Sequence, residues 1–286
     1  MGFKADIIIW DYSKREIHAR LTLHKAKVEA LAFSPNDLYL VSLGGQDDGS
    51  VVVWNVAKGE AVCGSPASAP SSGNCLTVKF SNNNDAVFIT AGNGTSELFA
   101  TCSKNDIRVW HSDTCKELLR ITVPNMTCHA VEFMQDGKSI ISAWNDGKIR
   151  VFTPESGKLI YAINNAHSMG VTAIAATSDC KKIISGGGEG QIGYWEVFDG
   201  SPIRELEGSL SGSINGMDIS PDGTHFVTGG DDKLVKVWGY NEGEVTHVGI
   251  GHSGSITRIK VCPNARSIIS ISADGAILRW KYPLLS

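Results

Sequence analysis

The sequence predicts an all-β fold, a β-propeller of six to seven four-stranded blades whose ring closes imperfectly. Three observations predict this fold. A bulky aromatic residue ends a short β-rich run at a regular spacing, Gly-containing turns separate the runs, and no window has the period of a useful amphipathic helix. The 31 glycines and 9 prolines also suit many tight hairpins.

The repeated aromatic residue ends the third predicted strand of each unit. It stands at Trp10, Trp54, Trp110, Phe152, Trp195, Trp238 and Trp280. Five of the six spacings match the length of one four-stranded propeller blade, which takes about 40–45 residues. The remaining spacing, from Trp54 to Trp110, is longer than one blade needs. We assign all seven units to a single propeller domain over residues 1–286.

The second and last units show the expected strand pattern best. The second unit predicts strands at 28–33, 38–43 and 50–54, and the last predicts strands at 255–261, 267–272 and 276–280. The segments between units at 17–23 and 118–123 are expected to form the outer, fourth strands of their blades. Asp48-Gly49 and Asp274-Gly275 supply the positive φ angles that a tight hairpin needs between the second and third strands.

Four polar positions recur with the aromatic residue. A Trp on the third strand can fill the space between neighbouring sheets, and its indole N–H then needs a buried acceptor. The pattern resembles that of the WD-repeat family, whose blades carry a His–Ser/Thr–Asp–Trp hydrogen-bond network. Two sets match all four positions, a third has Glu in place of Asp, and two are partial. They are His24, Ser42, Asp48 and Trp54; His252, Ser270, Asp274 and Trp280; His167, Ser185, Glu189 and Trp195; Thr228, Asp232 and Trp238; and Ser142 and Asp146.

These sets could be mistaken for catalytic triads. An enzyme needs one activated site, whereas a set repeated through the fold indicates packing. Residues 188–193 fit G-x-G-x-x-G, but they lie between two predicted strands, where no helix can receive a pyrophosphate. We therefore expect no enzymatic activity, no catalytic residue, no cofactor and no small-molecule substrate.

Composition excludes other classes. The net charge of −4 and the pI near 6.1 lack the basic footprint that nucleic-acid binding needs. No apolar run reaches membrane-spanning length, and no secretory signal is evident. Seven scattered cysteines suggest reduced, mostly buried thiols in the cytosol. The other histidines lack the spacing of a metal site, so no metal is expected; they are His18, His111, His129, His225 and His247.

One region has a local excess of positive charge. It contains Lys14, Arg15, Arg20, Lys25 and Lys27, which we call the basic edge. It could bind an acidic partner. The more common explanation is that charges on an outer strand prevent edge-to-edge pairing with other chains. The sequence leaves both alternatives open.

Longer stretches resemble a more specific family, the cilia- and flagella-associated WD-repeat proteins. They are residues 38–45, 121–129, 142–147, 194–200, 208–217 and 272–282. The resemblance implies a structural protein of the cytoskeleton in motile cilia and flagella. It implies a microtubule inner protein that binds tubulin and other such proteins in axonemal doublets. Fold analogy alone gives the alternative, a soluble WD-repeat adaptor in a ubiquitin ligase or signalling complex.

The chain departs from this family in length. Residues 86–92 and 98–103 both have the pattern of a second strand, in the interval between Trp54 and Trp110 that is too long for one blade. Internal blocks are therefore expected to be missing here and, from the resemblance alone, near Gly190 and Gln191. The first unit supplies only a third and a fourth strand, and the last lacks a fourth. Six blades result if residues 17–23 complete the last unit and leave 6–10 spare; seven need the duplicated strand or a partner.

Overall fold

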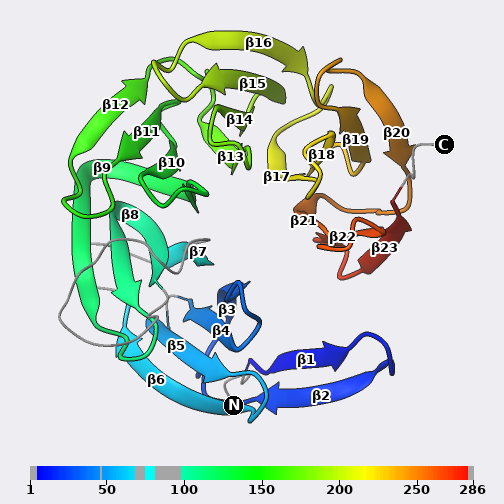
Figure 1. Ribbon diagram of the computed structural model, residues 1–286. Coiled ribbons are helices and arrows are strands. Elements are labelled where there is room, and N and C mark those ends of the chain that lie inside the picture. Colours follow the sequence, from blue (N-terminus) through cyan, green and yellow to red (C-terminus); the bar gives the residue numbers. More distant parts are fainter. Residues whose placement is uncertain (1–4, 46, 68–74, 81–97, 283–286) are drawn as a thin grey trace. The chain divides into compact units, whose positions relative to one another are not determined.

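The computed structural model describes residues 5–45, 47–67, 75–80 and 98–282 (Figure 1). Secondary structure in these residues consists of 23 strands without any helix, so the expected all-β class is confirmed. No helix in this part of the chain is long and apolar enough to cross a membrane. The duplicated strand expected at 86–92 lies outside the described residues.

The strands form antiparallel meanders (Figure 1). A two-stranded hairpin comes first, formed by β1 (Ile7–Asp11) and β2 (Glu16–Leu21). The next sheet has four strands, β3 (Val28–Phe33), β4 (Tyr39–Gly44), β5 (Ser50–Asn55) and β6 (Glu60–Pro66). A six-stranded sheet follows, with β7 (Cys75–Phe80), β8 (Leu98–His111), β9 (Glu117–Phe133), β10 (Ile140–Trp144), β11 (Ile149–Phe152) and β12 (Leu159–Ile163).

The remaining strands form three sheets. Two of them have four strands: β13 (Val171–Ala176), β14 (Lys182–Gly187), β15 (Gln191–Glu196) and β16 (Pro202–Glu207); then β17 (Ile214–Ile219), β18 (His225–Gly230), β19 (Val235–Gly239) and β20 (Val245–Gly249). The last has three: β21 (Ile256–Val261), β22 (Ser267–Ser272) and β23 (Ile277–Lys281). All seven repeated aromatic residues lie in strands, at the expected third-strand positions.

The expected count of six to seven four-stranded blades is wrong. The described residues form five sheets of three or more strands and the β1–β2 hairpin. The long strands β8 and β9 are the reason. Each turns within itself, at Asn105 (φ 76°) and Asn125 (φ 62°), and each continues where the sequence predicts separate strands. Two predicted units therefore join in one sheet.

The expectation that residues 17–23 complete the last unit is also wrong. β2 pairs with β1, from Ile7 opposite Leu21 to Asp11 opposite Glu16. The register shifts immediately before Trp10, as it does before Trp54, Trp195 and Trp238 where a third strand pairs with a fourth. The hairpin therefore has the pairing of the outer half of a sheet. Trp10 is 60% exposed, and in the described residues no further strand pairs with this hairpin.

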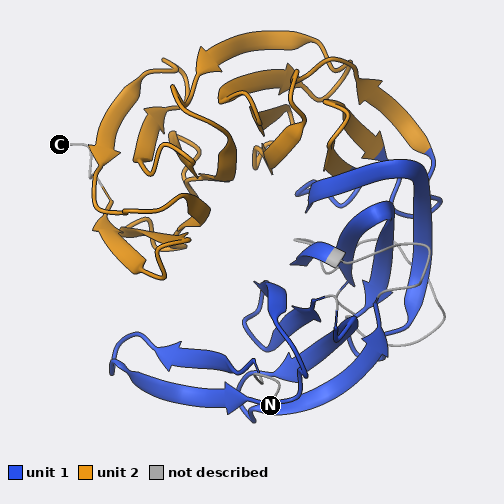
Figure 2. Cartoon of the chain, turned by 180° about the vertical axis from the view of Figure 1, so that it is seen from behind, with its two compact units in different colours: residues 1–140, 152–158 blue, residues 141–151, 159–286 orange. Residues whose placement is uncertain are grey.

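Contacts divide the chain into two compact units (Figure 2): residues 1–140 with 152–158, and residues 141–151 with 159–286. Each unit buries alternate side chains of its third strands against the following sheet, because successive side chains of a strand point to opposite faces. In the first unit, Val51 and Val53 of β5 pack with Val78 and Phe80 of β7. In the second, Ile192 and Tyr194 of β15 pack with Phe226, Trp238 and their neighbours. A single propeller over the whole chain stays a prediction.

Candidate functional site

The structure brings together the four members of the first polar set. Ser42 on β4 lies at the centre of the set. Its Oγ is 2.6 Å from Nε2 of His24, which precedes β3, and it accepts the indole N–H of Trp54 at 2.8 Å. Nδ1 of His24 contacts the carboxylate of Asp48 in the β4–β5 turn. The set thus joins the segment before β3, the β4–β5 turn and the strands β4 and β5.

The other two complete sets have the same arrangement. Ser185 Oγ lies 2.7 Å from His167 Nε2 and accepts the Trp195 N–H at 2.8 Å. Glu189 replaces Asp, and its Oε1 lies 2.5 Å from His167 Nδ1. In the third set, the corresponding distances are 2.7 Å from Ser270 to His252, 2.8 Å from Trp280 to Ser270, and 3.3 Å from His252 to Asp274.

Within each set, one arrangement of hydrogens gives every donor an acceptor, with one N–H on the histidine ring. Its Nδ1–H donates to the carboxylate, its Nε2 accepts the serine hydroxyl, and the serine oxygen accepts the Trp N–H. The three serines, Ser42, Ser185 and Ser270, are fully buried. Their hydroxyls are thus held by protein groups away from the surface, and each set joins neighbouring strands.

Sequence interpretation missed the groups that replace the absent histidines. In the set of Thr228 and Trp238, Asp232 accepts a hydrogen bond from Lys236 at 2.7 Å, and no histidine takes part. Asp146 likewise accepts from Arg150 at 2.6 Å. A cation beside the carboxylate thus does what the His N–H does elsewhere.

A third replacement lies in β8, where Arg108 donates to Asp106 at 3.1 Å. A sequence signal for all three exists: Arg108, Arg150 and Lys236 each stand two residues before the repeated aromatic. The sheets with a histidine have uncharged residues at this position, Val52, Gly193 and Leu278. This position therefore indicates which kind of partner the carboxylate has.

The aromatic position itself is exchanged in one sheet. Phe152 has no N–H, and Trp144 on β10 supplies one instead by donating to Ser142 Oγ at 2.7 Å. The guanidinium of Arg150 lies over this indole, 5.2 Å from the ring centre. The serine therefore keeps its indole donor although the donor comes from a different strand.

Three carboxylates of these sets, Glu189, Asp146 and Asp274, have a lowered pKa and so keep their charge. Burial alone would raise the pKa of Glu189, but hydrogen bonds from the Met169 and Glu189 N–H groups and from His167 lower it below the usual value. Burial also acts to raise the pKa of Asp146, and the Arg150 guanidinium outweighs it, so this pKa is lowered too. Hydrogen bonds, first that of the Ala276 N–H, lower the pKa of Asp274.

Asp231, next to the fourth set, gathers four donors. Ser255 Oγ donates at 2.6 Å, Asn215 Nδ2 at 2.9 Å, and Ser213 donates with its hydroxyl at 2.9 Å and its N–H at 3.0 Å. These bonds, that of Ser255 first, lower the pKa of Asp231 to about 2. The carboxylate links β17 to the start of β21.

Acid should therefore remove the contribution of Asp231 to stability. An unfolded Asp titrates near pH 4; the folded pKa is lower, so the stabilisation is complete above about pH 4 and is lost as the pH falls towards 2. We expect Asp231→Asn to be less stable than the parent at pH 7 and the difference to shrink below pH 4, as measured by urea unfolding. Asp113→Asn, an exposed control, should show no such trend. A difference independent of pH would contradict the assignment.

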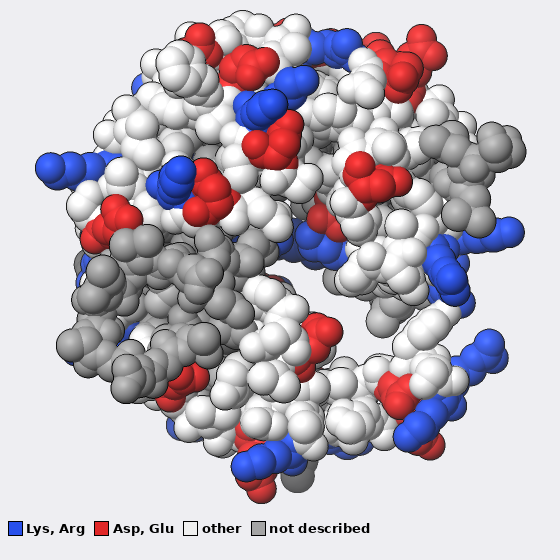
Figure 3. Space-filling model, viewed as in Figure 1, with Lys and Arg blue, Asp and Glu red and all other residues white. Residues whose placement is uncertain are grey.

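The basic edge is more balanced in charge than the sequence indicates. Lys14 and Arg15 lie in the β1–β2 turn, Arg20 on β2, and Lys25 and Lys27 before β3. Three of these cations have nearby carboxylates: Lys14 pairs with Asp11 at 3.8 Å, Arg20 with Asp6 at 3.8 Å and Lys27 with Glu29 at 3.0 Å. In the described part of the chain, Arg15 and Lys25 form no ion pair. On the face drawn in Figure 3, acidic and basic side chains lie interspersed.

The expectation of reduced thiols is wrong for two cysteines. Cys63 on β6 and Cys115 between β8 and β9 form a disulfide, with Cα atoms 5.9 Å apart. The pairing follows from the fold, which brings together residues 52 positions apart in sequence. In the described residues, no group of three or more His, Cys, Asp or Glu side chains could hold a metal ion. Residues 188–190 form the turn between β14 and β15, and residues 191–193 begin β15.

Comparison with known proteins identifies the family. The WD domain, G-beta repeat, matches residues 15–55, 157–196, 200–239 and 243–281. Cilia- and flagella-associated protein 52 of Bos taurus is 39% identical over 534 residues, covering 100% of this chain and 86% of that protein. The chain belongs to this family. The predicted WD repeats and the predicted family are therefore confirmed, and membership places the chain among proteins associated with cilia and flagella.

Two further relatives have the same description as the bovine protein. A Macaca fascicularis protein of the same description is 64% identical over 113 residues, covering 40% of this chain and 18% of that protein. One from Chlamydomonas reinhardtii is 29% identical over 339 residues, covering 61% and 55%. The bovine alignment extends over 534 residues although this chain has 286, so the bovine protein contains long internal stretches without a counterpart here.

Proposed function

We propose that this chain is a non-enzymatic structural protein of motile cilia and flagella. In this proposal it is a microtubule inner protein that binds tubulin and neighbouring inner proteins in axonemal doublets. The observation that carries the proposal is the 39% identity to cilia- and flagella-associated protein 52, which covers 100% of the chain. The closed polar sets support it, because side chains with catalytic potential are used inside the sheets.

The basic edge is the contact we propose for tubulin, which is an acidic protein. The chain carries a net charge of −4, so its overall charge cannot drive this association. Local charge must do so. Arg15 and Lys25 suit this role best, because the carboxylates near Lys14, Arg20 and Lys27 already offset those cations.

Co-sedimentation with microtubules tests both parts of the proposal. The parent chain should pellet with microtubules, and less of it should pellet as salt rises, because exposed charges more than about 8 Å apart are screened at physiological ionic strength. Arg15→Glu/Lys25→Glu should weaken binding about tenfold. The matched control is Lys116→Glu/Lys158→Glu, which makes the same charge change at exposed lysines elsewhere and should bind like the parent.

Two outcomes would contradict parts of this proposal. If the Arg15/Lys25 variant pellets as well as the parent, the basic edge only protects an outer strand from pairing, and the contact lies elsewhere. If the parent chain does not pellet at any salt concentration, tubulin binding is refuted. The alternative of a soluble adaptor for a ubiquitin ligase or signalling complex would then be preferred.

A further inference from the structure

In the described part of the chain, the sheet of β21, β22 and β23 ends at β23, whose outer edge is unpaired there. The sheets β3–β6, β13–β16 and β17–β20 each have a fourth strand paired with the third. In each of these pairs the register shifts immediately before the aromatic residue, Trp54, Trp195 or Trp238. Within the described residues, β23 pairs with β22 alone. Unpaired strand edges present backbone donors and acceptors to any extended chain.

Side chains of β23 are uncovered where their equivalents are buried. The residue three before the repeated aromatic is at most 2% exposed in five other strands, as Val51, Ile107, Ile149, Ile192 and Val235. The equivalent residue of β23, Ile277, is 72% exposed. Trp280 is only partly buried, whereas Trp54, Trp195 and Trp238 are buried. The sheet therefore lacks apolar cover that its counterparts have.

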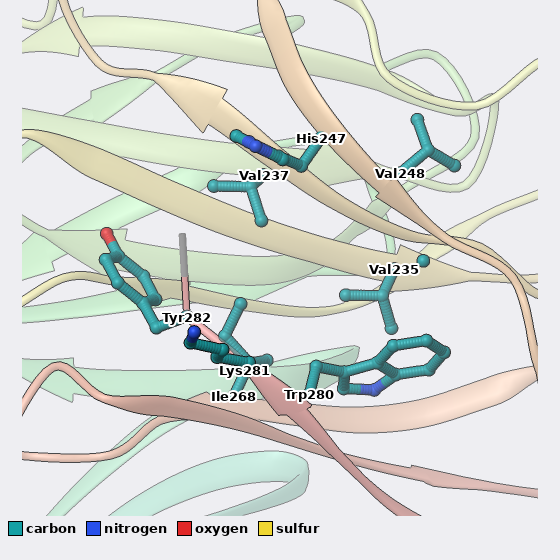
Figure 4. Close-up of a pocket in the computed structure, with 9 residues that line it drawn as sticks. Val235, Val237, His247, Val248, Ile268, Trp280, Lys281 and Tyr282 are labelled. Carbon is teal, nitrogen blue, oxygen red and sulfur yellow. The ribbon is translucent and has the colours of Figure 1, made fainter. Parts of the chain in front are cut away.

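A groove lies between this sheet and its neighbour (Figure 4), with a volume of about 440 Å³. Val235, Val237 and Val248 line one wall, from β19 and β20; Ile268 and Trp280 line the other, from β22 and β23. Between two other sheets of the second unit, the turn into the fourth strand lies against the preceding sheet. Leu206 of β16, for example, packs against Gly243 in the β19–β20 turn. In the described residues no such turn follows β23, and the groove is open beside Trp280.

The charge of this sheet is positive. Its three strands contain Arg258, Lys260, Arg279 and Lys281 and no Asp or Glu. Lys260 is paired with Asp218 of the neighbouring sheet at 2.5 Å. Lys281 lines the groove and forms no ion pair with any described residue. An acidic chain entering here would meet an uncompensated cation at the edge of the strand.

We propose that β23 is a docking strand: an extended acidic segment of a partner protein adds to its open edge as the fourth strand of this sheet. The segment pairs antiparallel to β23 and places alternate apolar side chains in the groove beside Val248 and Trp280. Main-chain pairing gives affinity, and the groove and Lys281 give specificity. This inference goes beyond the proposed function and does not depend on tubulin binding.

A synthetic peptide tests the proposal without knowledge of the partner. The probe is Glu-Val-Glu-Val-Glu-Val-Glu with blocked ends, compared with a peptide that has Lys in place of Glu and with one whose backbone amides are N-methylated. We expect the acidic peptide to bind the full chain and to protect the amides of residues 277–281 from hydrogen exchange. The N-methylated and Lys peptides should not do so, because the first cannot donate backbone hydrogen bonds and the second repels Lys281.

Two exposed positions serve for variants that keep the fold. Lys281→Glu should weaken peptide binding at least about tenfold through like-charge repulsion, and Val248→Glu should do the same by placing a carboxylate in the groove. Lys181→Glu, at an exposed lysine beside another sheet, should bind within about twofold of the parent.

Three results would each overturn the proposal. They are equal binding of the N-methylated peptide, parent-like binding by Lys281→Glu, and protection confined to residues outside 277–281. Protection of 277–281 that rises with protein concentration in the absence of peptide would also overturn it, since a second copy of the chain would then occupy the edge.

Discussion

Asp106→Ala is expected to lower the free energy of unfolding by about 3–5 kcal/mol. Arg108 is only 2% exposed, and Asp106 accepts hydrogen bonds from its Nε at 3.2 Å and its Nη2 at 3.1 Å. Glu117 lies farther from the guanidinium, at 3.7 Å, and is more exposed than Asp106. Removal of Asp106 takes this carboxylate away from a buried cation, which costs more than the loss of an exposed ion pair.

Urea unfolding monitored by circular dichroism measures this effect. Asp113→Ala, at an exposed position outside the polar sets, should change stability by less than about 0.5 kcal/mol. Asp106→Leu/Arg108→Met removes both charges and should recover most of the loss, because a buried pair replaced by apolar groups is often close to neutral. Equal effects of Asp106→Ala and Asp113→Ala would show that Arg108 does not depend on this carboxylate.

Ser185→Ala is expected to destabilise the chain by about 2–4 kcal/mol, since it leaves two buried groups without a partner and each such loss costs about 1–3 kcal/mol. The groups are the Trp195 N–H, which loses its acceptor, and His167 Nε2, which loses its donor. Ala is smaller than Ser by one oxygen, so little packing is lost. Ser178→Ala, at an exposed turn position, serves as the control.

Thermal and urea unfolding of the two serine variants should differ clearly. Hydrogen exchange adds a local measurement: Ser185→Ala should lose protection in β14 and β15, the strands that the set connects. If Ser185→Ala is as stable as Ser178→Ala, the repeated sets do not hold the sheets together, and a different role for the buried histidines would be required.

Much of the fold follows from short-range sequence signals. The spacing of the repeated aromatic residue, the turn glycines and the apolar runs predict the third strands, all of which the structure contains. The three complete His sets also follow, because in each the His precedes its serine by the same offset and a Trp follows that serine by a nearly constant one. Residues at fixed offsets within one repeat meet wherever that repeat folds into one sheet.

Tertiary structure alone decided how these repeats combine. The joining of two predicted units through β8 and β9, the pairing of β2 with β1 and the Cys63–Cys115 disulfide depend on which distant residues become neighbours. Local propensity cannot specify that choice. Arg108, Arg150 and Lys236 share one position in the repeat, two residues before the aromatic residue. Only the ion pairs in the structure show that they take the place of histidines beside the carboxylates.

The sequence by itself thus determined the repeat, its third strands and the three complete polar sets, because each of these is written within about 45 residues of chain. The family followed from longer stretches spread along the sequence. The structure decided where the repeats are incomplete. Trp10 and Trp280 end equivalent third strands, yet Trp10 is exposed in a half-sheet and Trp280 borders an open groove. Burial depends on the strands that pack beside a residue, and no property of the residue or its own repeat records whether those strands are present.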